Sequence, residues 1–490
     1  MNKASVVTKL EGLVIDISQI RHLLEKWETE FDWSRQLSDE QLRQEIIKIS
    51  QIKRLIEKGQ ADLSLREKIL TNFQETVKGF NLDVRPDEVE FLWEQEVAKP
   101  PKGYQAFIDA QFQWVQFLIN LAGSSSNPRY QAWRERQMAR CTSQVFNGHQ
   151  TGHFPVSFEL SKGCSVGCWF CGVAAPRLGD IFFYTEENAK LWQEILALMK
   201  QTLGEAAGAG FCYCATDPLD NPDYEKFLCD FHAILGVFPQ TTTAQPLKDP
   251  ERTRSLLKIS LSKGCLLNRF SIISLKLLER LHEEFTPEEL AFVGLVLQNP
   301  ESDLPKSISG RARERAQRQA EKEHEALDDA LSGTTACVSG FLINMVDRTV
   351  KLISPCNASD RWPLGYRIYE QGIFTNAADL KLFLEGAIDK HMPLGVKNSD
   401  RLRFRPDLQY ESLPDGFQLS TRFFKHKFRY APHMKQLGET LLQGNKTVEE
   451  ILRLFNIWGI PTDQILKSLN LMFDRGVFDD EPISELSKRA

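Results

Sequence analysis

The stretch ELSKGCSVGCWFCG, residues 159–172, sets Cys164, Cys168 and Cys171 within eight residues. The preceding run VSFEL is short and mostly apolar, which predicts a buried strand. The three cysteines are therefore expected on a tight loop at the end of that strand. Loops at the carboxyl ends of parallel strands commonly carry the chemistry of α/β proteins.

The spacing C-x3-C-x2-C suits structural zinc poorly, because such sites normally take four ligands and commonly draw them from two cysteine or histidine pairs. Cys212 and Cys214 make a poor second pair, since they lie far along the chain and only one residue apart. Three clustered thiolates suit a 4Fe–4S cluster in which one iron has no protein ligand. That iron can bind S-adenosylmethionine and pass an electron to its sulfonium, which yields a 5′-deoxyadenosyl radical.

This motif, with Phe170 between its second and third cysteines, resembles that of the radical S-adenosylmethionine superfamily. The resemblance implies that all three cysteines hold the cluster. It also implies a Gly-Gly-Glu-Pro-like motif that holds the methionine amine. Here the segment ATDP, residues 215–218, offers Thr216 and Asp217 as oxygen acceptors for an ammonium, although both glycines are replaced and the acid is Asp.

Two further residues are candidate ligands of S-adenosylmethionine. Ser271 lies at the end of the expected strand NRFSIIS and could face the ribose and carboxylate, although a serine on a strand is more often simply packed. Gln298 follows the expected strand GLVLQ and is a candidate for the adenine side of the site.

The pattern along the chain predicts an α/β fold. Apolar runs at VSFEL, GFCYCA, VFPQTTTAQ, RFSII and GLVLQ alternate with amphipathic helical patterns, as in right-handed βα units around a parallel sheet. We expect a partial or full radical S-adenosylmethionine (β/α) barrel over residues 150–335. An N-terminal helical region is expected over residues 1–122.

Two further regions follow the expected barrel. A hairpin, FLINMV-DR-TVKLIS, lies in a post-barrel extension over residues 336–396, and a winged-helix-like domain is expected over residues 397–490. The charged stretch SGRARERAQRQAEKEHEALDDALSG, residues 309–333, reads as a solvated helix rather than a mobile lid.

Composition indicates which compartment and which partners to expect for this chain. The 490 residues carry a net charge of −6, so the whole chain gives no reason to expect nucleic acid as a partner. No segment approaches the roughly 20 apolar residues of a membrane span, and the first residues do not resemble a signal peptide. We expect a cytoplasmic protein without a membrane partner. A radical enzyme of this type would also need a reducing partner such as flavodoxin or ferredoxin.

Three segments together resemble the radical peptide epimerases of proteusin (polytheonamide-type) ribosomal-peptide pathways: the cysteine stretch extended to ELSKGCSVGCWFCGVAAP, ATDPLDNPDY, and ISPCNASDRWPLGYRIYE. The resemblance covers about residues 100 to 390. It implies that L-residues of a ribosomally made precursor peptide become D-residues, by removal of the Cα hydrogen and return of hydrogen to the opposite face.

Hydrogen return needs a donor, and a cysteine thiol suits this role because its S–H bond is weak. Cys356 is the preferred candidate, since it lies in the loop-forming context SPCNAS and within a segment that carries the resemblance. Cys337 and Cys214 remain alternatives. Cys141, Cys229 and Cys265 are expected to be packed as small hydrophobic residues, and Cys212, on the same expected strand as Cys214, also stays possible.

The C-terminal region is expected to bind the precursor peptide. Its strand-like runs are followed by helices, with Thr447 as an N-cap and Glu450 three residues on, as in a capping box. This order resembles the leader-binding domains of the pyrroloquinoline quinone maturation type. Residues 397–435 hold nine Lys or Arg against four Asp or Glu, which suits an acidic leader peptide better than DNA.

Two alternatives stay open. A radical maturase could instead form thioether or carbon–carbon cross-links, although such enzymes often carry a second dense cysteine cluster, and none follows residue 171 in the sequence. The chain could also be a zinc-stabilised leader-binding protein without catalytic activity.

Overall fold

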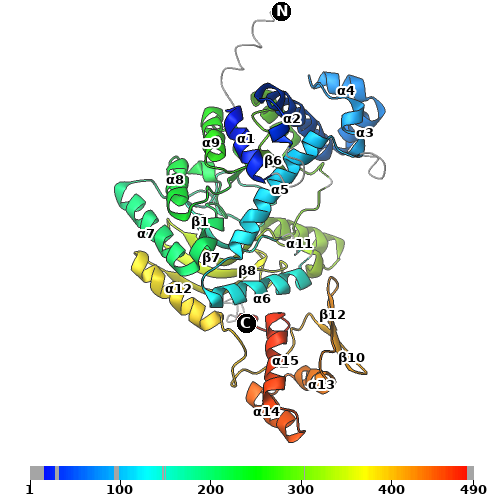
Figure 1. Ribbon diagram of the computed structural model, residues 1–490, viewed down its shortest axis with the longest axis vertical. Coiled ribbons are helices and arrows are strands. Elements are labelled where there is room, and N and C mark those ends of the chain that lie inside the picture. The colour runs from blue at the N-terminus through cyan, green and yellow to red at the C-terminus, as the bar shows by residue number, and fades with distance from the viewer. Residues whose placement is uncertain are drawn as a thin grey trace, which may run out of the picture. The chain divides into compact units, whose positions relative to one another are not determined.

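The computed structural model describes residues 16–27, 33–92, 99–145, 148, 151–302 and 304–482. The chain divides into two compact units. The first comprises residues 1–120, 211–213 and 217–306, and the second comprises residues 121–210, 214–216 and 307–490. The segment 150–335 therefore contributes to both units. Figure 1 labels most of the helices and some of the strands.

The first unit begins with helices, as the amphipathic pattern predicts. The helices before its sheet are α1 (Ile17–Trp27), α2 (Asp39–Ala61), α3 (Leu63–Thr71), α4 (Phe73–Gly79) and α5 (Lys102–Ala122), the last of which runs into the second unit. Ser38 starts α2 with a capping box, because its side chain accepts from the Gln41 N–H while the Gln41 side chain accepts from the Ser38 N–H.

A three-stranded parallel sheet completes the first unit. Its strands β4 (Thr242–Thr243), β5 (Asn268–Ile272) and β6 (Val293–Leu297) lie in that order. The helices between and before them are α8 (Tyr224–Leu235), α9 (Pro250–Ser262) and α10 (Leu275–Glu284). Apolar side chains of β5, β6 and α10 form one buried cluster, which fixes the helix on the sheet.

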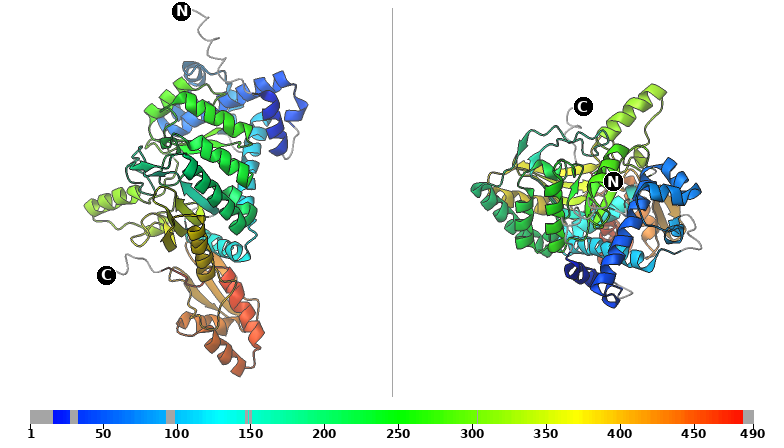
Figure 2. Two further views of the ribbon diagram at one scale, coloured as in Figure 1. Left: turned by 90° about the vertical axis from the view of Figure 1, so that its left-hand side faces the viewer. Right: turned by 90° about the horizontal axis from the view of Figure 1, so that it is seen from above.

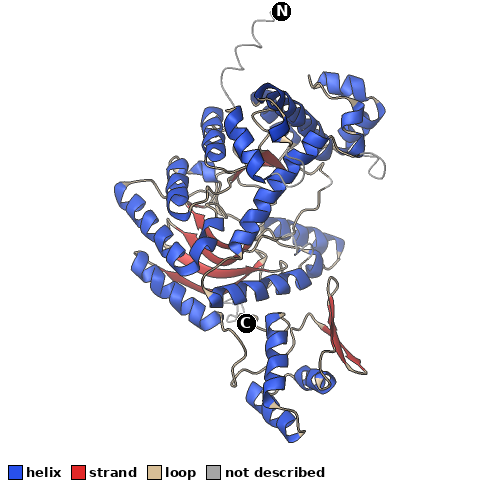
Figure 3. Ribbon diagram, viewed as in Figure 1, coloured by secondary structure: helices blue, strands red, loops and turns tan. Residues whose placement is uncertain are grey.

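The second unit contains a four-stranded mixed sheet. Strand β1 (Phe154–Glu159) pairs in parallel with β7 (Val338–Asn344), which pairs antiparallel with β8 (Thr349–Pro355), and β8 pairs antiparallel with β9 (Tyr366–Ile373). Figure 3 shows these strands in red. Helices α6 (Pro128–Gln144), α7 (Glu186–Leu203) and α12 (Ala377–His391) pack on this sheet. The rings of Trp192 on α7 and Phe158 on β1 lie 4.8 Å apart.

The C-terminal residues of the second unit form a small β-then-α domain. Strands β10 (Gln409–Leu413), β11 (Gly416–Ser420) and β12 (Lys425–Phe428) make an antiparallel sheet with β12 at one edge. Helices α13 (Met434–Gln443), α14 (Val448–Ile457) and α15 (Thr462–Asp474) follow, drawn orange to red in Figure 2. Apolar side chains from the strands and all three helices share one core.

Several sequence predictions are confirmed. The fold is mixed α/β, the hairpin over residues 338–355 forms, and the charged stretch becomes helix α11 (Arg311–Glu323), in which only Arg313 is buried. Thr447 and Glu450 form the predicted capping box at α14. In the described part of the chain, no helix has the length and apolar character needed to cross a membrane.

Two predictions about the sheet need correction. GFCYCA was expected to be a strand, but residues 210–215 form an irregular segment with a single bridge position at Phe211. Part of the reason is that the Ala215 N–H donates to the Glu159 side chain instead of to a neighbouring strand. VFPQTTTAQ yields only the two-residue strand β4, because Pro239 has no N–H and the Thr241 N–H donates to the Asn268 side chain.

The expected (β/α) barrel is not confirmed. Across the described ranges the strands form four small sheets, and no closed barrel is present. Parallel strands with intervening helices do occur in the first unit, and β1 and β7 are parallel in the second unit. The α/β class is therefore established at this coarser level.

Candidate functional site

The cysteine loop follows β1, and backbone hydrogen bonds hold its two ends together. Strands β2 (Ser161–Lys162) and β3 (Asp180–Ile181) pair antiparallel on either side of it. Next to them, the Cys164 N–H donates to the Pro176 carbonyl at 2.9 Å. Gly163 has a φ of +81°, and a Cβ there would lie 2.4 Å from the Arg177 carbonyl oxygen. Only glycine fits this close approach of the two sides of the loop.

The three thiols of the loop influence one another electrostatically. Burial, together with Cys164 and Cys171, raises the pKa of Cys168 to about 11, while Arg311 acts in the opposite direction. Backbone N–H groups also approach two of the sulfurs: Val166 lies 3.5 Å from the Cys164 Sγ and Ala175 lies 3.3 Å from the Cys171 Sγ. Hydrogen bonds of this kind to ligand sulfurs tune the potential of iron–sulfur clusters.

Three cysteine thiols on one loop are the type of donor that an iron–sulfur cluster takes. Within the described ranges, no three His, Cys, Asp or Glu side chains are grouped closely enough to hold a metal ion. The donor set at the loop is three thiols with N–H donors and one arginine, Arg311, nearby. The arginine would help to stabilise the negative charge of a thiolate-bound cluster.

The start of α11 joins the cysteine loop to a second loop. The Arg311 N–H donates to the Cys171 carbonyl at 3.0 Å, and the preceding Gly310 N–H donates to the Pro363 carbonyl at 2.8 Å. Gly310 has a φ of +55°, and a Cβ there would lie 2.4 Å from the Cys171 carbonyl oxygen. Pro363 belongs to the loop 356–365, which carries Cys356. Two consecutive amides thus connect the cysteine loop and the Cys356 loop.

Glu159, the last residue of β1, anchors the segment that contains ATDP. Its carboxylate accepts from the Ala215 N–H at 2.8 Å and from the Asn344 side-chain amide at 2.9 Å. Glu159 is only 7% exposed, and burial raises its pKa, although these two hydrogen bonds oppose the shift. Side chains of a strand alternate between faces, so Glu159 and Asn344 project opposite to their apolar neighbours Phe158 and Ile343.

Cys214 lies near this carboxylate, and also near Cys337 and Cys171. Burial raises the pKa of Cys214 well above its usual value, and Glu159, Cys337 and Cys171 raise it further. The structure therefore brings one candidate donor thiol, Cys214, close to Cys171 and to a second candidate, Cys337. Sequence reasoning gave Glu159 no role, although a glutamate at the end of the apolar run VSFEL was an available signal.

Cys356 has different surroundings from these two thiols. It follows β8 directly, is 3% exposed, and its N–H donates to the Gly365 carbonyl at 2.9 Å. Burial raises the pKa of its thiol to about 12, and Arg367, Glu481 and Arg140 lie close enough to affect it. The connection to the cysteine loop runs through Gly310 and Pro363, as described above. Its role as hydrogen donor stays a prediction.

Asp217 and Thr216, the candidate ligands of the methionine amine, fall in different units. The Asp217 carboxylate accepts from the Thr243 hydroxyl and the Ala244 N–H, both at 2.7 Å, and from the Leu219 N–H at 3.0 Å. These bonds give Asp217 a clear part in shaping the turn around β4. A role in cofactor binding stays a prediction for both residues.

Ser271 and Gln298 come together at the carboxyl ends of β5 and β6. Ser271 pairs with Val296, and the Gln298 N–H donates to the Ile272 carbonyl at 2.8 Å.

Phe170 lies on the cysteine loop with its ring 5.4 Å from that of Trp169. Trp169 is stacked in turn under the Arg315 guanidinium of α11, at 4.6 Å.

Comparison with known proteins places the chain in a family. It is 39% identical over 361 residues to the uncharacterized protein y4wI of Sinorhizobium fredii (strain NBRC 101917 / NGR234), a match that covers 73% of this chain and 70% of that protein. The chain belongs to the same family as y4wI. No protein-family model matches the chain, and no solved structure matches it either.

Proposed function

We propose that this chain is a radical S-adenosylmethionine enzyme that converts L-residues of a ribosomally made precursor peptide to D-residues. The observation that carries the proposal is the closed three-cysteine loop after β1, joined through Gly310 and Arg311 to the loop that carries Cys356. This arrangement ties the candidate cluster site to a buried thiol within one unit.

Cys164, Cys168 and Cys171 would hold a 4Fe–4S cluster. Together with S-adenosylmethionine, the bound cluster would supply a 5′-deoxyadenosyl radical that takes hydrogen from a peptide Cα. Residues of the chain itself would carry out the hydrogen return. The raised pKa of Cys356 keeps its thiol protonated near neutral pH, so it can give a hydrogen atom to the opposite face of the Cα. One electron from a flavodoxin- or ferredoxin-type partner and one proton would then restore the thiol.

The C-terminal domain would bind the leader of the precursor. Strand β12 lies at the edge of its sheet, and Lys425 and Lys427 on that strand are exposed. An extended acidic peptide could add beside β12, with main-chain hydrogen bonds giving affinity and the lysines favouring acidic side chains. A pocket of about 500 Å³ near Trp458, His433 and Gln464 is a second place in this domain where a peptide could lie.

Anaerobic reconstitution and co-expression test the proposal together. A brown protein with about four irons and D-residues in a co-expressed precursor, read by chiral amino-acid analysis, is the expected result. A new cross-link without D-residues would support the cross-linking alternative. A colourless protein with one zinc would support the non-catalytic alternative.

A further inference from the structure

The loop 356–365 is held from several sides. The Gly365 N–H donates to the Trp362 carbonyl at 2.9 Å, and the Asn357 side chain donates to the Gln144 carbonyl at 2.8 Å. Arg313 of α11 donates to Asp360 at 2.8 Å. These contacts come from residues that lie before or within the same region of the chain. One further group of contacts comes from its far C-terminal end.

Glu481 binds three side chains around this loop. Its carboxylate accepts from the Trp362 indole N–H, from the Arg367 Nε at 2.8 Å and from Arg140. Burial alone would raise the pKa of Glu481, but Arg367 and Arg140 outweigh that effect and the pKa is lowered. Trp362 lies within the Cys356 loop, so Glu481 contacts the loop directly.

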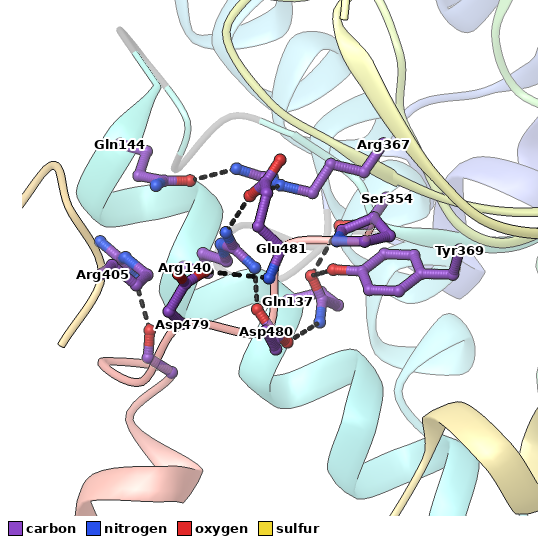
Figure 4. A network of polar contacts seen from close by, with 12 residues as sticks. Gln137, Arg140, Gln144, Ser354, Arg367, Tyr369, Arg405, Asp479, Asp480 and Glu481 are labelled. Carbon is purple, nitrogen blue, oxygen red and sulfur yellow. Dashed lines mark hydrogen bonds and ion pairs between the residues drawn. The ribbon is translucent and has the colours of Figure 1, made fainter. Parts of the chain in front are cut away.

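Arg367 and Asp480 extend the contact to the residues just before Cys356. Arg367 donates to the Pro355 carbonyl at 3.0 Å, next to Cys356 in the chain. Asp480 forms an ion pair with Arg140 and accepts from the Gln137 side chain at 3.4 Å. Figure 4 shows how Gln137 also accepts from the hydroxyls of Ser354 and Tyr369, both at 2.9 Å.

Residues 477–481 are at the same time part of the C-terminal domain. Val477 and Phe478 belong to the core of that domain. The Arg405 N–H donates to the Val477 carbonyl at 3.0 Å, and the Asp479 N–H donates to the Arg403 carbonyl at 3.0 Å. The segment therefore links the candidate peptide-binding domain to the loop that carries the candidate donor thiol.

We propose that Glu481 is a positioning residue that holds the Cys356 loop closed through Trp362 and Arg367. Because the segment 477–481 is anchored in the C-terminal domain, that domain contributes to hydrogen return as well as to peptide binding. This inference rests on the proposed function for its catalytic consequence. Its structural half, the closure of the loop over Cys356, can be measured without any activity.

The structural test is the rate at which iodoacetamide alkylates Cys356 in the folded protein, read by peptide mass spectrometry. Glu481→Ala is expected to raise that rate at least about tenfold, since the buried thiol becomes accessible as its thiolate. Buried Cys265, in the other unit, serves as the internal reference. Glu449→Gln, at an exposed glutamate of α14 paired with Arg453, is the control variant and should change nothing.

The catalytic test compares two products of the same reaction. Glu481→Gln keeps the size of the side chain and should fold, but it loses the charge that binds Arg367 and Arg140. It should still form 5′-deoxyadenosine within about threefold of wild type, while D-residues per 5′-deoxyadenosine fall at least about tenfold. A general loss of stability would instead lower both products together.

The outcomes separate the two proposals. Unchanged alkylation of Cys356 in both Glu481 variants would overturn the positioning role, as would faster alkylation with an unchanged product ratio. Faster alkylation in the variants, combined with no D-residue from the wild-type enzyme, would leave the loop closure standing and overturn the proposed function.

Discussion

The Arg311 N–H donates to the Cys171 carbonyl oxygen at 3.0 Å, at the first residue of α11. The preceding residue, Gly310, donates to the Cys356 loop. Helix α11 is highly charged, and its sequence predicts only a solvated helix. It nevertheless begins where the cysteine loop meets the Cys356 loop, the two loops on which the proposed chemistry depends.

Replacing Cys164, Cys168 and Cys171 by Ala should abolish iron–sulfur absorbance and the cleavage of S-adenosylmethionine, because no thiolate of the loop remains to hold the cluster. The fold should survive, since backbone hydrogen bonds hold the two ends of the loop together without the cysteine side chains. Cys229 was expected to be packed, but the structure shows it exposed, so Cys229→Ala is the matched control and should keep both properties. Cleavage by the triple variant would end the radical proposal.

Gly310→Ala should destabilise the protein and lower its iron content. The residue has a φ of +55°, which costs a side chain roughly 1–3 kcal/mol, and its Cβ would also collide with the Cys171 carbonyl oxygen. Gly236→Ala is the control, because Gly236 has a φ of +81° with no atom within 4 Å of the added Cβ. Urea unfolding should show a larger loss of unfolding free energy for Gly310→Ala than for Gly236→Ala. Iron analysis should show a loss of iron only for Gly310→Ala.

Glu159→Gln should change how stability depends on pH. The folded protein raises the pKa of Glu159, so the native state binds its proton more tightly than the unfolded chain does. The contribution of Glu159 to stability is therefore largest at low pH and falls as the pH rises above its ordinary value of 4.5 toward its folded pKa.

A series of urea unfolding measurements at rising pH checks this sign. The unfolding free energy of wild type minus that of Glu159→Gln should decrease with pH and then level off. The variant should also lose one of the two hydrogen bonds to Ala215 and Asn344, at a cost of about 1–3 kcal/mol. A difference that grows with pH would show that the carboxylate is stabilised in its charged form.

The contrast between what the sequence predicts and what it misses has a physical basis. Local signals succeeded where the cue lies within a few residues, as with Thr447 and Glu450 at α14 or the two mostly apolar runs on either side of Asp347 and Arg348 in the β7–β8 hairpin. The prediction for GFCYCA failed because a strand needs a neighbouring backbone partner, and the Ala215 N–H there is taken by a glutamate 56 residues earlier.

Contacts between distant charged residues were also missed. Nothing local in the sequence relates Glu481 to Arg140 or Arg367, more than a hundred residues away, since ion pairs of this kind have no periodic pattern.

The position of Glu481 near the C-terminal end affects how a truncated chain should behave. Deletion from residue 397 onward removes the proposed leader site, but it also removes Glu481 from the Cys356 loop, so binding and catalysis should both change.

Point substitutions on β12 separate binding from that structural effect. Lys425→Glu with Lys427→Glu should weaken binding of an acidic precursor at least about tenfold at low salt, with a smaller effect at high salt. Lys446→Glu with Lys467→Glu makes the same charge change elsewhere in the domain and is the control. Isothermal titration over a salt series measures both. Unchanged affinity, with weaker binding by Trp458→Ala, would place the leader in the pocket instead.

Cys356→Ala should separate the two halves of epimerisation. Formation of 5′-deoxyadenosine does not need the donor thiol, whereas hydrogen return to the opposite face does. The variant should therefore still make 5′-deoxyadenosine but form little or no D-residue. Cys337→Ala and Cys214→Ala are the matched comparisons, because both thiols lie in the same unit as Cys356 and Cys214 lies near both Cys171 and Cys337.

Solvent deuterium checks the same step in the wild-type enzyme. A thiol exchanges its hydrogen with water, so reaction in D2O should place one deuterium on each inverted Cα, while the abstracted hydrogen leaves with 5′-deoxyadenosine. Normal epimerisation by Cys356→Ala, together with loss in Cys337→Ala or Cys214→Ala, would move the donor to that thiol and keep the mechanism. D-residues without deuterium would exclude an exchangeable donor, and the epimerase mechanism proposed for this chain would fail.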